Sequence, residues 1–223
     1  MSCAGRARHA RENRAGNRYE LSLTRGGPLL YPRMRVGILG GSFNPAHEGH
    51  LHISLIALKR LGLDRVIWMV SLQNPLKSEQ EMASLESRLH TADEMARHPD
   101  IVVTDIEQRL NTRYTADTLT ALRRRWPEVH FVWLMGADNL IQLPRWRDWN
   151  WIMGVMPVAV LDRTGGGVKA LHGKAAIRYH RCRLPQERAM QLALREAPAW
   201  TFIACRRHRA SSTAIRAAQK ILQ

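Results

Sequence analysis

Short apolar segments alternate with longer amphipathic segments from Met34 onward, and this alternation is the feature that most limits the fold. Near-continuous apolar strands that are each followed by a helix are typical of a parallel sheet covered on both faces. Because crossover connections between parallel strands are right-handed, the expected fold is a doubly wound α/β sheet. Ligands of such sheets bind at the carboxyl ends of the strands, near the point where the strand order reverses.

The apolar runs and the helical spacings define the expected elements. The expected strands cover residues 35–39, 65–70, 101–104, 129–135, 158–161 and 200–204. The expected helices cover residues 49–61, 85–97, 115–126, 186–196 and 213–222. In the first helix Leu51, Leu55 and Leu58 recur with helical spacing, which predicts one buried stripe. Residues 163–184, which are rich in glycine and basic side chains, are expected to form a long loop.

The net charge of +15 is the one extreme value of the composition. A strongly basic chain favours anionic partners such as nucleotides, nucleic acid or acidic lipids. Residues 1–33 hold seven arginines, two glutamates and almost no apolar periodicity. We interpret them as a basic, disordered N-terminal extension, or as a stretch before a true start at Met34, outside a catalytic domain at 34–223. A nucleic-acid or membrane tether is the alternative interpretation.

The cysteines and the apolar stretches indicate the cellular compartment of the chain. Cys3, Cys182 and Cys205 lie far apart and outside any Cys-x-x-Cys pair, so neither a disulfide framework nor a structural zinc site is expected. A reducing cytoplasm is therefore the predicted location. The longest mostly apolar stretch, residues 151–161, is shorter than the roughly 20 residues that a bilayer-spanning helix needs. We expect no membrane partner and no secretory signal.

The most informative segment is a glycine-rich turn between the first expected strand and the first expected helix. Paired Gly40 and Gly41 let the chain turn sharply and let a phosphate approach the backbone. The N–H groups at the following helix start favour an anion. His47 and His50 lie three residues apart, so they project to the same side of the first helical turn. Two imidazoles beside a helix N-terminus suit the charge of a phosphate.

Three other interpretations of this turn are weaker. A dinucleotide-binding loop would need Gly-x-Gly-x-x-Gly, which the turn does not contain. A zinc-protease helix would need histidines at positions i and i+4, but Leu51 occupies the second position. Two ordinary loop histidines in one glycine-rich strand-to-helix turn would be a rare coincidence.

A second constellation lies near the C-terminus. Ser211 or Ser212 is a good N-cap for the last expected helix. Arg216 in the first turn of that helix opposes the helix dipole unless an anion is bound there. An ordinary capped helix with a solvated arginine explains this segment equally well when it is taken alone.

Together these segments resemble the nucleotidyltransferase superfamily that carries a His-x-Gly-His motif, and within it the bacterial nicotinate-nucleotide adenylyltransferases. The motifs that carry the resemblance are Gly-Ser-Phe-Asn-Pro-x-His-x-Gly-His at 41–50, Gln-Asn-Pro-Leu-Lys at 73–77, Tyr-Thr-Ala-Asp-Thr-Leu at 114–119, Gly-Ala-Asp-Asn-Leu at 136–140, and Ser-Ser-Thr-Ala-Ile-Arg at 211–216. The likeness spans residues 34–217, and residues 1–33 have no counterpart. Arg147 follows Trp146 where an aromatic residue is common in the family.

The resemblance implies a Rossmann-like nucleotidyltransferase fold. It also implies adenylyl transfer from ATP to nicotinate mononucleotide in NAD biosynthesis, giving nicotinate adenine dinucleotide and pyrophosphate. The implied catalytic residues are His47 and His50. The implied ATP-phosphate ligands are Gly40, Gly41, Ser42, Phe43, Ser211, Ser212, Thr213 and Arg216. The implied ligands of nicotinate mononucleotide are Asn74, Lys77, Thr115, Asp138 and Trp146.

Mg²⁺ is expected to arrive with ATP, and no metal site made of protein ligands is expected. Trp146 offers a flat face for a pyridine ring, although plain core packing explains it equally well. Nicotinamide mononucleotide or phosphopantetheine is an alternative acceptor. A basic nucleic-acid-binding protein is the alternative from another class, but no nucleic-acid partner is expected because no recognition helix or RNP-like aromatic strand is found in the sequence. The sequence does not indicate an oligomeric state.

Overall fold

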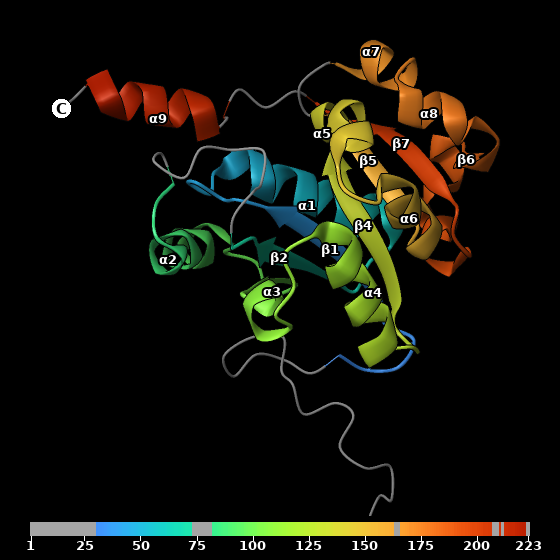
Figure 1. Cartoon of the computed structure of the whole chain (residues 1–223), viewed down its shortest axis with the longest axis horizontal. Coiled ribbons are helices and arrows are strands. Elements are labelled where there is room, and N and C mark those ends of the chain that lie inside the picture. Colours follow the sequence, from blue (N-terminus) through green and yellow to red (C-terminus); the bar gives the residue numbers. More distant parts are fainter. Residues whose placement is uncertain (1–29, 73–81, 163–165, 207–209, 211, 222–223) are drawn as a thin grey trace, which may run out of the picture.

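A parallel sheet of seven strands forms the centre of the computed structural model (Figure 1). The structure describes residues 30–72, 82–162, 166–206, 210 and 212–221. The strand order is β3-β2-β1-β4-β5-β7-β6, and every neighbouring pair is parallel. The strands are β1 (Arg35–Gly41), β2 (Arg65–Val70), β3 (Ile101–Thr104), β4 (His130–Gly136), β5 (Val158–Asp162), β6 (Arg183–Leu184) and β7 (Trp200–Ala204). The doubly wound parallel sheet expected from the sequence is confirmed.

Helices cover both faces of this sheet. The α-helices are α1 (Glu48–Leu61), α2 (Leu85–Met95), α3 (Ile106–Arg109), α4 (Thr115–Arg125), α5 (Ala137–Gln142), α6 (Trp149–Val155), α7 (Gly167–Leu171), α8 (Lys174–Arg178) and α9 (Ser212–Ile221). The 3₁₀ helices among the described residues are η2 (Leu143–Arg145), η3 (His180–Cys182) and η4 (Gln186–Leu194). One core lies between the sheet and α4 to α8, and the other lies between the sheet and α1, α2 and η4. Successive strand residues alternate between the two cores, as Trp133 and Leu134 do.

The strand order reverses between β1 and β4. From β1 the chain adds β2 and β3 on one side, and from β4 it adds the remaining strands on the other. The crevice at such a reversal, beyond the carboxyl ends of the strands, is where doubly wound sheets bind ligands. Two segments flank it here: the turn that follows Gly41 and the start of α5, which holds Asp138.

The long loop expected over 163–184 is wrong for the residues that the structure describes there. Residues 166–184 form α7, α8, η3 and β6. The small residues Ala170, Ala175 and Ala176 are buried, so these short helices dock closely on the rest of the fold. The sequence did not predict these helices because their apolar pattern is weak. The helix expected over 186–196 is present as the 3₁₀ helix η4.

The stripe expected on the first helix is correct only in part, because Leu51 and Leu58 pack against the core but Leu55 does not. Leu55 is 39% exposed, whereas Ile53, Ser54, Ala57 and Leu61 are buried. Ser54 occupies a core position because its hydroxyl accepts a hydrogen bond from the Trp68 indole N–H at 2.8 Å. A polar residue that is satisfied inside the core does not register in a hydrophobic pattern.

The folded domain starts before Met34. Leu30 is only 5% exposed and belongs to the core beneath α4. The Arg33 N–H donates to the Glu128 carbonyl at 2.7 Å. The Leu30 side chain and the Arg33 main chain, which the sequence assigned to the basic extension, therefore contact the domain, and residues 1–29 lie outside the described residues.

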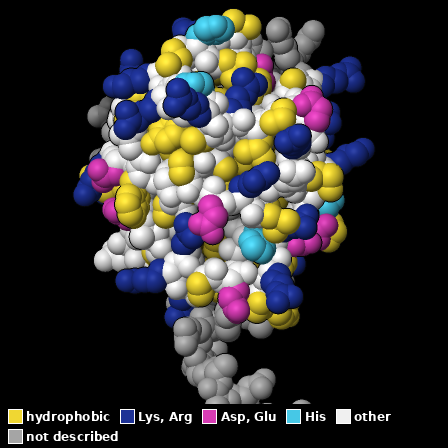
Figure 2. Space-filling view, turned by 90° about the vertical axis from the view of Figure 1, so that its right-hand side faces the viewer, with side chains coloured by type: hydrophobic (Ala, Val, Ile, Leu, Met, Phe, Trp, Pro, Cys, Tyr) yellow, Lys and Arg dark blue, Asp and Glu magenta, His cyan; other side chains and the backbone are white. Residues whose placement is uncertain are grey.

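The face that carries α7 and α8 is basic. Figure 2 shows it with Lys and Arg side chains outnumbering Asp and Glu. Residues 166–185 contain no Asp or Glu, and their exposed cations are Lys169, Lys174, Arg178, Arg181 and Arg183. Within the described ranges, no helix has the length and apolar character that a membrane span requires.

Candidate active site

Two histidines cap the N-terminus of α1. His47 is the N-cap in an extended conformation, and its Nδ1 accepts the Gly49 N–H at 3.1 Å. In return, His50 Nδ1 accepts the His47 N–H at 3.2 Å. This is a capping box, which usually pairs Ser or Thr with Glu or Gln, made here from two imidazoles. The ring centroids are 4.0 Å apart, which confirms that the two side chains share one side of the helix.

The capping box also selects the tautomer of each ring. Because Nδ1 is the acceptor in both rings, a neutral imidazole must carry its proton on Nε2. His47 is 4% and His50 is 8% exposed, so both lie in a largely desolvated environment. Two Nε2–H donors beside a helix N-terminus create a site suited to a phosphate anion.

Buried aromatic rings pack beside the histidines. The centroid of Phe43 lies 4.7 Å from His50 and 5.2 Å from Trp68. Phe43 is 1% exposed and has a φ of 46°, a left-handed conformation that costs a non-glycine residue on the order of 1–3 kcal/mol. The packing of its ring against Trp68 holds the turn in this conformation.

Close backbone approaches explain two glycines of the motif. A Cβ on Gly40 would lie 2.2 Å from the ring of Trp133. A Cβ on Gly49 would lie 2.8 Å from Cε1 of His47 and 3.2 Å from the Ala210 carbonyl. Gly49 therefore leaves room for the His47 ring and for the C-terminal segment at the same place.

The C-terminal segment meets the turn after β1, and Figure 1 shows α9 outside the two layers that cover the sheet. The Ser212 hydroxyl donates to the Pro45 carbonyl at 3.1 Å, and Arg216 Nη1 donates to the Asn44 carbonyl at 2.6 Å. Two motifs that are about 170 residues apart thus form one site. Thr213 is exposed next to them, and Ser211 lies outside the described residues.

Three of the residues predicted to bind the mononucleotide, Thr115, Asp138 and Trp146, lie on the α4–α6 side of the sheet. Thr115 is the first residue of α4, and Asp138 is in the first turn of α5. Trp146 is partly buried and packs against the core on that side. Arg147 lies over the ring of Tyr114, the N-cap of α4, at 4.4 Å from its centroid. This contact joins the segment after η2 to the start of α4. Asn74 and Lys77 lie outside the described residues.

Two buried charged residues near the turn were not predicted from the sequence. Arg88 on α2 is 2% exposed, and Glu107 on α3 is 4% exposed. Arg88 shares one stripe of α2 with Leu85, Leu89 and Ala92, and a cation within an apolar stripe is the pattern that could have identified it. Glu107 has no comparable pattern because α3 is a helix of only four residues.

Burial raises the pKa of Glu107 to about 7, although hydrogen bonds from the Leu72 N–H and the Thr118 hydroxyl oppose the rise. The folded chain therefore holds a proton that the unfolded chain has already released between about pH 4.5 and 7. The contribution of this group makes the free energy of unfolding fall as the pH rises through that window, by about 3 kcal/mol at most.

Glu107→Gln should remove this part of the pH dependence. We expect the variant to lose less stability than the wild type between pH 5 and pH 8, with the difference between them changing by ~2–3 kcal/mol. Urea unfolding at both pH values measures this, and Glu86→Gln at an exposed site of α2 is the control. Parallel pH profiles for the wild type and Glu107→Gln would show that Glu107 does not titrate in this range.

The chain matches a known family and named relatives over most of its length. The cytidylyltransferase-like family matches residues 38–218. This range includes the turn between β1 and α1 that leads to His47 and His50, here called the histidine turn, and the start of α9. The "Probable nicotinate-nucleotide adenylyltransferase" of Parvibaculum lavamentivorans is 54% identical over 188 residues, covering 84% of this chain and 94% of the relative. The protein of the same name from Cereibacter sphaeroides strain ATCC 17025 is 55% identical over 184 residues, covering 82% of this chain and 97% of the relative.

The chain belongs to the nicotinate-nucleotide adenylyltransferase family. Among solved structures, Plasmodium falciparum nicotinic acid mononucleotide adenylyltransferase complexed with NaAD matches with a TM-score of 0.62 and 15% identity, covering 83% of each chain. That likeness supports the fold. The Rossmann-like nucleotidyltransferase fold and the family expected from the five motifs are therefore confirmed.

Proposed function

We propose that this chain transfers the adenylyl group of ATP to nicotinate mononucleotide, forming nicotinate adenine dinucleotide and pyrophosphate in NAD biosynthesis. The observation that carries the proposal is the reciprocal histidine cap on α1, in a chain about 54% identical to a relative of that name. The cap supplies two Nε2–H donors and a helix N-terminus at the strand reversal, where a nucleotide is expected to bind.

The reaction is a direct in-line displacement. A phosphate oxygen of nicotinate mononucleotide forms a bond to the α-phosphorus of ATP, and the bond from the α-phosphorus to the bridging oxygen of the β-phosphate breaks. Both electrons of the broken bond leave with pyrophosphate, so no enzyme side chain is modified. Such a reaction needs positioning and charge stabilisation more than acid–base chemistry.

Different side chains of the site bind different phosphates of ATP. His47 and His50 hold the α- and β-phosphates, and their donors stabilise the negative charge that grows on the leaving oxygen. Ser212, Thr213 and Arg216 at the start of α9 hold the β- and γ-phosphates, together with Ser211. Gly40, Gly41, Ser42 and Phe43 let the nucleotide approach the backbone of the turn.

Mg²⁺ enters this reaction with ATP. The donors of the turn are N–H groups and imidazoles, which suit phosphate oxygens, whereas Mg²⁺ prefers carboxylate, phosphate and water oxygens. No cluster of three or more His, Cys, Asp or Glu suited to a metal occurs among the described residues. We infer that the ATP phosphates and water hold the ion.

The start of α4 favours an acceptor with a carboxylate. Thr115 and the first N–H groups of α4 lie at the positive end of the helix dipole. Arg147, which is paired with Asp148 at 3.3 Å, adds a guanidinium beside Tyr114. Nicotinate carries a ring carboxylate that accepts from such donors. The NH₂ of nicotinamide would face donors and leave some unpaired, at a cost of ~1–3 kcal/mol.

We therefore expect kcat/KM for nicotinate mononucleotide to exceed that for nicotinamide mononucleotide by roughly 10- to 100-fold, with no turnover of phosphopantetheine. Pyrophosphate release from ATP and Mg²⁺ with each acceptor measures this. Trp146→Ala should raise KM for nicotinate mononucleotide more than KM for ATP, and Trp151→Ala, 58% exposed on α6, should change neither. Equal kcat/KM for the two pyridine nucleotides would overturn the preference and leave adenylyl transfer standing.

A further inference from the structure

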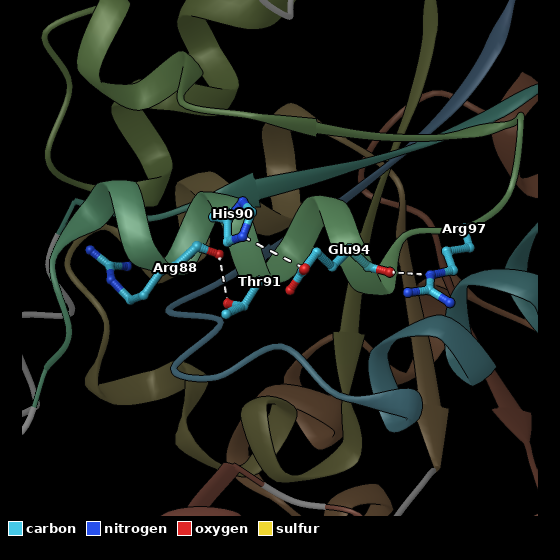
Figure 3. A network of polar contacts seen from close by, with 5 residues as sticks. All are labelled: Arg88, His90, Thr91, Glu94 and Arg97. Carbon is cyan, nitrogen blue, oxygen red and sulfur yellow. Dashed lines mark hydrogen bonds and ion pairs between the residues drawn. The ribbon is translucent and has the colours of Figure 1, made fainter.

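Arg88 is a buried cation on the inner face of α2. Figure 3 shows its side chain pointing away from His90 and Glu94 on the same helix and from Arg97 just beyond the end of the helix. Those three residues are exposed; His90 pairs with Glu94 at 3.6 Å, and Arg97 donates to the Glu94 carbonyl at 2.8 Å. The exposed fraction of Arg88 is 2%, so its guanidinium is used inside the fold.

The guanidinium of Arg88 bonds to three separate segments. Nη1 donates to the Ser42 carbonyl at 2.8 Å and to the Ser71 carbonyl at 2.7 Å. Nη2 donates to the Leu72 carbonyl at 3.1 Å, and Nε donates to the Ala83 carbonyl at 3.0 Å. In the part of the chain that the structure describes, all four acceptors are main-chain oxygens. Only the planar fork of arginine can meet so many fixed oxygens at once, since a lysine ammonium has three donors at a single point.

The bonded segments meet at the turn that precedes the histidines. Ser42 follows β1 directly, and Ser71 follows β2, where its N–H donates to the Gly41 carbonyl at 2.9 Å. The Ala83 N–H donates to Asn44 Oδ1 at 3.3 Å, and the Asn44 carbonyl accepts from Arg216. Arg88 thus lies at the centre of contacts that tie the start of α2 to the turn and, through Asn44, to α9.

The peptide at Leu72 is held from two sides. Its carbonyl accepts from Arg88, and its N–H donates to the carboxyl group of Glu107. Leu72 and Ala83 are bonded to the same guanidinium although eleven positions separate them. The two described ends of the β2–α2 connection, at Leu72 and Ala83, are therefore fixed beside the histidine turn.

We propose that Arg88 is a positioning residue for both substrates, since its four carbonyl bonds hold the histidine turn and the two ends of the β2–α2 connection in one fixed arrangement. The proposal rests on the proposed function and adds a residue to it. Because the bonds of Arg88 go to main-chain carbonyls, we assign it an action through the segments that it holds. Displacing a reacting group by about 1 Å lowers the rate by roughly 10²-fold. Loss of these four hydrogen bonds should therefore impair substrate binding and turnover more than folding.

Arg88→Lys keeps the charge and most of the stem but cannot meet all four oxygens. We expect KM for ATP and KM for nicotinate mononucleotide each to rise by roughly 10-fold or more, while circular dichroism shows a folded chain at the assay temperature. Arg97→Lys, at an exposed position just beyond the C-terminus of the same helix, should leave both KM values unchanged. A purely structural role would lower only the amount of active protein, and hence kcat with both KM values unchanged. That result would overturn the proposal.

A second variant and a binding measurement separate the outcomes further. Millimolar methylguanidinium should lower both KM values of Arg88→Ala, and ammonium at equal ionic strength should not; rescue by both ions alike would contradict the proposal. Unfolding of both variants would likewise make Arg88 a stability residue only.

Calorimetric binding of inorganic pyrophosphate needs no turnover, and we expect Arg88→Lys to bind it more weakly than the wild type. If the wild type fails to release pyrophosphate from ATP with any pyridine mononucleotide, the proposed function fails, whereas unchanged pyrophosphate binding in Arg88→Lys overturns the positioning role alone.

Discussion

His47→Ala and His50→Ala should each lower kcat by roughly 10²- to 10³-fold, because each removes a donor that stabilises charge in the transition state, typically worth ~3–4 kcal/mol. His47→Ala should also destabilise α1 by ~1 kcal/mol, because it removes the N-cap. Steady-state kinetics with ATP and nicotinate mononucleotide measures the first effect, and urea unfolding measures the second.

His47→Asn separates the two roles of this side chain. The Oδ1 of asparagine can accept an N–H of the first turn as His47 Nδ1 does, but asparagine has no group at the Nε2 position. We expect His47→Asn to keep the stability of the wild type and to lose as much kcat as His47→Ala. His90→Asn, at an exposed position on α2, is the matched control. A folded His47→Asn enzyme with near-normal kcat would rule out a phosphate-binding role for Nε2.

Gly49→Ala should lower kcat by roughly 10²-fold while leaving the chain folded. The new Cβ would lie 2.8 Å from Cε1 and 2.9 Å from Nδ1 of His47, so the ring must move. It would also lie 3.2 Å from the Ala210 carbonyl, which belongs to the segment that leads into α9. A displacement of about 1 Å at a reacting group is enough for a loss of this size.

Gly154→Ala is the matched control for this substitution. Nothing lies within 4 Å of a Cβ on Gly154, which sits inside α6, so alanine should be neutral or add up to ~1 kcal/mol of helix stability. Both variants change glycine to alanine in a helix, and only one of them meets the His47 ring. Equal kinetics for the two would show that the close contact at Gly49 has no functional consequence.

The sequence predicted the sheet, the histidine turn and the family because local patterns determine each of them. β1 and β2 are short apolar runs, and the capped helix start needs only residues 47–50. The start of α9 was predicted as an anion site only in combination with the turn. Its hydrogen bonds to Asn44 and Pro45 join residues about 170 positions apart, which no local pattern specifies.

Other parts of the fold follow from tertiary packing and were therefore missed. Ser54 is buried on α1, where it accepts a hydrogen bond from Trp68, and Leu55 beside it is exposed. Arg88 is buried because four carbonyl oxygens converge on α2 once β1 and β2 are side by side. The helices α7 and α8 are short and dock through alanines, which carry little periodicity. In each case the partner that decides the structure is distant in sequence.

Transfer of isotope from ATP tests the central claim most directly. The purified chain is incubated with Mg²⁺, nicotinate mononucleotide and ATP labelled at either the α- or the γ-phosphorus, and the products are separated. If the adenylyl group is transferred, the α-label appears in nicotinate adenine dinucleotide and the γ-label in an equal amount of pyrophosphate. Release of the γ-label as orthophosphate, or retention of the α-label in ATP, ADP or the protein itself, would contradict direct adenylyl transfer to the mononucleotide.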